Sequence, residues 1–79
     1  MPKVLEVGPY KFYFYSRENE EPPHIHVRRE RSEAKFWLEP FEVEWNRRFP
    51  RHELNKVAEL VQEHRVQLLE EWYAYFDQA

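Results

Sequence analysis

Hydrophobic and polar residues alternate along the first two thirds of the chain, and this pattern predicts β-strands. Alternation sends successive side chains to opposite faces of a strand, and aromatic and β-branched residues are typical of strands. Five segments, separated by turn residues, have this character: residues 4–7, 10–15, 24–28, 33–38 and 41–45. An antiparallel meander is the simplest arrangement of such a series.

The hydrophobic period changes to that of a helix after Pro50, a residue that fits the first turn of a helix. An apolar stripe runs in phase from Leu54 to Phe76 without an intervening Gly or Pro. We expect one helix, or two nearly collinear helices with a break near residues 63–65 and a half-buried His64 at the break. The sequence therefore predicts an α+β fold, with an antiparallel sheet of four to five strands packed on one long or kinked C-terminal helix.

The length of the chain, 79 residues, indicates a single domain over residues 1–79, strand-rich over 1–49 and helical over 50–78. A continuous helix of about 25 residues would be about 38 Å long. Strands of five or six residues cover only about 17–20 Å. The end of the stripe therefore either packs on a partner chain, which we favour, or folds back on the same sheet. The predicted partner interface consists of Leu68, Leu69, Trp72, Tyr75 and Phe76.

The composition narrows the setting of the protein. The chain has no Cys, so it has neither disulfides nor a Cys-based zinc site. Since no segment has the length of a membrane span or the apolar core of a signal peptide, we expect a cytoplasmic protein without membrane contact. The net charge of −3 does not suggest general nucleic-acid binding, but the arginines gather in two clusters at residues 28–31 and 47–51.

Alternation also predicts which side chains share the sheet face opposite the helix. Phe12, Phe14 and Phe36, with Phe41 and Trp45, are expected in the core. The opposite, exposed face then collects Tyr13, Tyr15, His24, His26, Arg28, Lys35 and Trp37. A shift of the strand register by one residue would destroy this grouping.

Three kinds of chemistry suit this face. His24 and His26 have the residue type of an acid–base pair, and Lys35 or Arg28 would stabilise a phosphate transition state, as in metal-independent RNA cleavage. Tyr13, Tyr15 and Trp37 are candidate stacking groups for unpaired RNA bases.

The third chemistry is metal binding by the His-x-His pair, with Glu21 or Glu33 as an added carboxylate. Because only two histidines cluster, we assign no metal ligand and no cofactor, and a metal-binding protein stays an alternative. The ordinary alternative to all three is a solvated sheet face without chemistry.

Two segments carry a family resemblance: Glu-Pro-Pro-His-Ile-His-Val at residues 21–27 and Ala-Lys-Phe-Trp-Leu at residues 34–38. Together with residues 2–15 and the helical residues 68–76, they resemble the small bacterial proteins of the domain of unknown function 4160 family. The family signature includes two histidines, matched by His24 and His26, and a Lys-Phe-Trp, matched by residues 35–37. The chain departs from the pattern at Pro50, where a Ser-type cap is usual.

The resemblance implies a function only through gene context. Members look like one half of two-gene cassettes, beside a small protein of the domain of unknown function 2442 type. This implies a toxin-like component of a toxin–antitoxin module with an antitoxin-like protein as the partner. The outer-face residues add RNA cleavage or RNA binding as its activity, and the helical stripe adds a homodimer as the other possible partner. The sequence leaves open whether the protein is an enzyme, and a non-enzymatic interaction module is the competing class.

Overall fold

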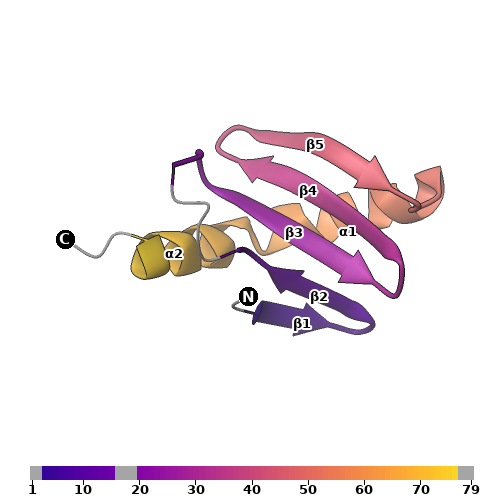
Figure 1. Ribbon diagram of the computed structural model, residues 1–79, viewed down its shortest axis with the longest axis horizontal. Coiled ribbons are helices and arrows are strands. Elements are labelled where there is room, and N and C mark those ends of the chain that lie inside the picture. Colours follow the sequence, from indigo (N-terminus) through magenta and orange to yellow (C-terminus); the bar gives the residue numbers. More distant parts are fainter. Residues whose placement is uncertain (1–2, 16–19, 77–79) are drawn as a thin grey trace.

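A computed structural model describes residues 3–15 and 20–76 of the chain. Five strands precede two helices (Figure 1). The strands are β1 (Lys3–Val7), β2 (Tyr10–Tyr13), β3 (His24–Arg29), β4 (Ser32–Leu38) and β5 (Phe41–Arg47), and the helices are α1 (Arg51–Glu63) and α2 (Arg65–Phe76). The α+β prediction is confirmed, and the C-terminal part is two helices instead of one long helix.

The strands form one antiparallel sheet in the order β1-β2-β3-β4-β5, which is the predicted meander. Gly8 has a φ of +56°, a left-handed conformation that glycine adopts without steric cost, and it turns the chain between β1 and β2. The turns of the β1–β2 and β3–β4 hairpins lie side by side at one end of the sheet (Figure 1). We call the face covered by the helices the inner face and the opposite one the outer face.

The core lies between the inner face and the helices. It joins aromatic and aliphatic residues of the three central strands to one stripe along both helices, as the hydrophobic period predicted. Its fully buried members include Phe12, Ile25, Val27, Phe36, Leu38, Val57, Val61 and Leu68. Phe41 stacks on Phe36 with ring centroids 5.8 Å apart, so its predicted place on the inner face is confirmed.

The helical segment is interrupted at His64, which is one of the two arrangements that the sequence left open. The His64 main-chain N–H donates to the Leu60 carbonyl at 3.1 Å, and the imidazole Nδ1 lies 2.9 Å from the same oxygen. α2 then starts with a hydrogen bond from the Leu68 N–H to the His64 carbonyl, at 2.8 Å. Arg65 fixes the new helix to the sheet, because its Nε donates to the Leu38 carbonyl at 2.6 Å.

α2 lies beside the end of the sheet where β2 ends and β3 begins (Figure 1). Phe14, which follows β2, packs there against Trp72 and Phe76, with ring centroids 5.4 and 5.2 Å apart. The length argument predicted that the apolar stripe extends beyond the sheet. Instead, α2 packs against residues of this chain. Leu68 and Trp72 are buried in the core of this chain, Leu69 and Phe76 are partly buried against it, and Tyr75 is exposed.

One predicted core residue lies on the other face. A β-bulge shifts the register between β4 and β5 at Lys35 and Phe36, so that Lys35 pairs with Trp45 while Phe36 pairs with Val43. Trp45 consequently packs near His26 on the outer face, with ring centroids 5.9 Å apart. The prediction that Trp45 belongs to the inner core is wrong, because strict alternation does not hold across a bulge.

Candidate functional site

The strand register brings the predicted site residues together on the outer face. Tyr13 of β2 pairs with His26 of β3, which pairs with Lys35 of β4. His24 pairs with Trp37 at the neighbouring position. The grouping inferred from alternation is therefore present in the fold, and the remaining question is which of these groups a ligand can reach.

The histidines are not accessible. The exposed fraction is 0% for His24 and 2% for His26, and Tyr13 and Lys35 are also buried. The expectation of an exposed face shared by these residues is wrong, because their own rings cover one another. The rings that contact the two histidines on the outer face, together with the histidines themselves, are called the histidine cluster: Tyr13, Tyr15, His24, His26, Trp37 and Trp45.

His26 lies at the centre of the histidine cluster. Its ring stacks on Tyr13 at 5.3 Å with an interplanar angle of 15°, and it meets Tyr15 edge-on at 4.7 Å. His24 closes another side, with ring centroids 5.3 Å apart. A general acid or base must come within hydrogen-bond reach of a substrate proton, and a ring enclosed in this way is shielded from a substrate.

His24 joins the outer face to the helices. Its ring lies 5.6 Å from Trp37 of the sheet and 4.8 Å from Trp72 of α2. Its Nδ1 lies 3.1 Å from the Pro22 carbonyl oxygen, which can only accept a hydrogen bond. Nδ1 therefore carries the proton and donates, and the bond holds the Pro-Pro segment against the start of β3.

Tyr13 and Lys35 are each held by a carboxylate. The Tyr13 hydroxyl donates to Glu33 Oε2 at 2.5 Å, and burial together with this bond raises the pKa of Tyr13, so the phenol stays protonated. Lys35 Nζ lies 2.6 Å from Glu21 Oε1 and 4.7 Å from the centroid of the Trp37 ring. The lysine that the sequence favoured as a phosphate stabiliser is thus already paired.

The other end of the outer face is open. A cavity of about 360 Å³ is lined by Pro9, Lys11, Arg28, Arg29 and Glu30, at the two neighbouring hairpin turns. A smaller cavity of about 150 Å³ is lined by Lys3, Lys11, Tyr13 and Arg28. Lys11 and Arg28 line both, and we call Lys3, Lys11, Arg28 and these two cavities the basic trough.

The cations of the basic trough differ in their pairing. Lys3 Nζ lies 2.8 Å from Glu6 Oε1, and this bond lowers the pKa of Glu6. Among residues 3–15 and 20–76, neither Lys11 nor Arg28 forms an ion pair. The Arg28 guanidinium carbon lies 5.7 Å from the Tyr13 ring centroid, within cation–π distance.

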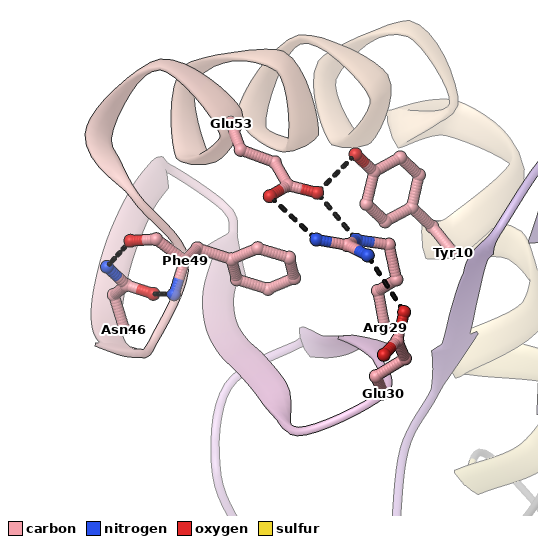
Figure 2. Close-up of polar contacts among 6 residues, drawn as sticks. All are labelled: Tyr10, Arg29, Glu30, Asn46, Phe49 and Glu53. Atoms are coloured by element: carbon pink, nitrogen blue, oxygen red, sulfur yellow. Dashed lines mark hydrogen bonds and ion pairs between the residues drawn. The ribbon is translucent and has the colours of Figure 1, made fainter.

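Arg29, the next residue, is bound on the inner face (Figure 2). Its Nε and Nη2 donate to the two carboxylate oxygens of Glu53 on α1, at 2.7 and 3.0 Å. The Tyr10 hydroxyl donates to Glu53 as well, at 2.8 Å. The bonds from Arg29 and then Tyr10 lower the pKa of Glu53, and the same pairing raises the pKa of Arg29. This contact fixes α1 to the sheet. Of the two adjacent arginines, Arg28 is therefore the one whose guanidinium is accessible.

Sequence reasoning selected Arg28 but not Lys3 or Lys11. By alternation, Lys11 lies on the same face as Tyr13, two residues further along the strand, and Gly8-Pro9 is a turn pair typical of the hairpin that brings β1 beside it. The missing signal was pairing: a lysine in a strand gives no indication of whether a carboxylate will lie next to it.

In the part of the chain that the structure describes, no group of three or more His, Cys, Asp or Glu side chains is placed to hold a metal ion. No helix within these residues is long and apolar enough to cross a membrane.

The fold defines a class of small α+β proteins in which a five-stranded antiparallel meander is backed by two helices and presents a mixed aromatic and basic outer face. The model of the domain of unknown function family DUF4160 matches residues 10–73, so the chain belongs to this family. The comparisons with curated proteins and with solved structures gave no match.

Proposed function

We propose that this protein is the toxin-like subunit of a bacterial two-gene module and acts by binding RNA through the outer face of its sheet. The observation that carries the proposal is that Lys11 and Arg28 form no ion pair among the described residues and lie on the same sheet face as a group of aromatic rings, of which Tyr13 contacts Arg28. Basic groups next to accessible rings are the usual platform for single-stranded RNA.

The accessible rings support the stacking part of this proposal. Tyr15 is 37% exposed, and Trp37 and Trp45 are half-buried. Arg47 lies against Trp45, its guanidinium carbon 5.0 Å from the ring centroid. In the strand register, Arg28 and Arg47 both pair with Glu33, and Trp45 and Trp37 lie in the neighbouring rows of the same face. The arginines are the phosphate-binding groups of this proposal and the rings are its base-stacking groups, with Tyr13 as a buried support.

The enclosed histidines favour binding over cleavage. His26 stacks on Tyr13, and Tyr13 in turn contacts Arg28. In this proposal the two histidines shape the platform and are positioning residues, whereas an acid–base role would require the cluster to open first. The structural role explains why buried imidazoles are compatible with an RNA-binding face.

Fluorescence anisotropy with a labelled single-stranded RNA tests the proposal. Because each phosphate contact releases a bound counterion, we expect the affinity to fall steeply with salt. Arg28→Glu and Lys11→Glu should each weaken binding at least about tenfold in 50 mM salt, since each replaces an attraction by a repulsion. Lys56→Glu, an identical charge change on the exposed side of α1, is the matched control and should change binding less than about twofold.

The histidines give the second arm of this test. His26→Gln should weaken RNA binding only moderately, and growth inhibition on expression of the protein should follow RNA binding in all variants. If Arg28→Glu and Lys11→Glu bind RNA as tightly as the Lys56→Glu control, the outer face is not the RNA-binding surface and the proposal is wrong.

A partner-binding function is the second candidate. Val66 and Tyr73, on the outer side of α2, are 66% and 46% exposed. Apolar groups exposed on one helix suit contact with an antitoxin-like protein or a second copy of the chain. Val66→Asp should then abolish co-purification with the neighbouring gene product, or reduce the mass seen by light scattering. An unchanged complex would remove this candidate.

A further inference from the structure

We propose that the basic trough is a binding pocket for a phosphate monoester, and that it recognises the phosphorylated 5′ end of an RNA strand or a nucleoside 5′-monophosphate. The inference rests on the proposed RNA-binding function and names the ligand chemistry of one part of that face. It starts from two cations, Lys11 and Arg28, that line the same two cavities and form no ion pair among the described residues.

The charges suit a dianion. A phosphate monoester carries a charge of about −1.5 to −2 near neutral pH, whereas a phosphate inside an RNA chain carries a single charge. Lys11 and Arg28 supply two positive charges to the cavity. Arg29 does not add a third, because Glu53 and Glu30 both bond to it. Lys11 and Arg28 form no ion pair among the described residues, and Glu6, opposite Lys11 in the sheet, acts on it only through space. Both cations can therefore turn to a doubly charged terminal group.

The cavity also has a suitable size and a fixed donor. Its volume of about 360 Å³ falls in the range of small-molecule sites, which begins near 300 Å³. The guanidinium of arginine presents a planar fork of donors that matches phosphate oxygens. Arg28 is oriented before binding, because it lies against Tyr13, whose hydroxyl is held by Glu33. A donor that is already oriented loses less entropy when it binds its ligand.

Glu30 gives the proposal a distinctive consequence. Its carboxylate lies at the cavity and bonds to Arg29 Nη1 at 3.1 Å, as Figure 2 shows. Glu53 holds the rest of the Arg29 guanidinium, so Arg29 stays in place without Glu30. Glu30→Gln therefore removes a repulsive charge from the pocket and should tighten phosphate binding about two- to threefold.

The test compares two oligouridylates of ten nucleotides, one with a 5′-phosphate and one with a 5′-hydroxyl. Binding is followed by anisotropy and by the amide resonances of residues 10–11 and 28–30. We expect the 5′-phosphorylated strand to bind at least about fivefold more tightly. Lys11→Gln and Arg28→Gln should each remove this preference, and Lys56→Gln should keep it. Unfolding curves of the variants verify that each is folded.

Uridine 5′-monophosphate and uridine form the second arm. Resonance shifts with the nucleotide and none with uridine support a monoester pocket. If both oligouridylates bind equally, the pocket proposal is overturned while RNA binding stands. If the nucleotide binds at Lys11 and Arg28 but neither strand does, the pocket stands and the RNA-binding function is overturned. Failure of every probe overturns both.

Discussion

The histidine cluster and the basic trough lie on the same face of one sheet, yet their side chains have opposite surroundings. In the cluster, imidazole and aromatic rings enclose one another, and Lys35, which lies next to it against Trp37, is paired with Glu21. In the trough, Lys11 and Arg28 face a cavity without an ion pair among the described residues. The residues that look most reactive in the sequence are thus enclosed, and less conspicuous ones are available to a ligand.

The difference shows that chemical type and availability are separate properties. A buried imidazole surrounded by rings contributes packing, and a buried lysine needs a carboxylate to offset its desolvation. An exposed arginine keeps its charge for a partner. The adjacent residues Arg28 and Arg29 of β3 illustrate this difference. Arg28 faces the basic trough, whereas Arg29 is bound to Glu53, as Figure 2 shows.

The largest loss of stability is expected where Trp72 of α2 packs against His24. Trp72 is buried against His24 and Phe14, so Trp72→Glu would place an unpaired charge in the core. We expect this variant to be unfolded at 25 °C by circular dichroism. Val66→Glu, the same kind of change at an exposed position of the same helix, should fold with a loss below about 0.5 kcal/mol. A folded monomeric Trp72→Glu protein would contradict the burial of Trp72 in the core.

The second largest effect is expected from truncating a histidine, which should cost more stability than truncating an arginine of the basic trough. His26→Ala removes a buried ring with four aromatic neighbours, and the resulting cavity should cost about 2–4 kcal/mol in the free energy of unfolding. Arg28→Ala, two residues further along the same face, should cost less than about 0.5 kcal/mol. Urea unfolding measures both. Equal losses would mean that the two ends of the face do not differ as described.

The pairing of Lys35 should have a smaller effect. Glu21→Gln leaves the buried ammonium without its carboxylate partner, and we expect a loss of about 1 kcal/mol in the free energy of unfolding. Glu20→Gln, a neighbouring exposed position, is the control and should be neutral. If the two variants unfold at the same urea concentration, the Lys35–Glu21 contact does not contribute to stability.

The smallest expected effect is the pH dependence of the Arg29–Glu53 contact. The pKa of Glu53 is lowered in the folded protein, so its stabilising contribution is complete above the ordinary carboxyl pKa of about 4.3 and is lost as the pH falls further. Glu53→Gln should therefore be less stable than wild type at pH 7, and the difference should shrink toward pH 3. Glu59→Gln on exposed α1 surface should show no such convergence. Thermal unfolding at several pH values measures this.

Much of the fold could be predicted because its signals are local. The alternating pattern and the Gly8-Pro9 turn identified the strands, and the 3.6-residue period placed Val57, Val61 and Leu68 on the buried stripe. Trp45 could not be placed, because a single extra residue in β5 inverts the alternation. The burial of Trp72 in its own chain was also missed. The rings that enclose it belong to Phe14, which follows β2, and to His24, and both are far from Trp72 in the sequence.

The sequence by itself determined the α+β architecture and all of the outer-face grouping except Trp45, and it located the point near His64 where the helix could break, because periodicity and turn chemistry act over a few residues. Only the tertiary structure decided which of the outer-face groups are enclosed and which are open. Enclosure depends on contacts between segments far apart in the chain, such as Glu21 with Lys35 and Trp72 with His24. Among the outer-face cations predicted from the sequence, these contacts enclose Lys35, whereas Arg28 stays exposed.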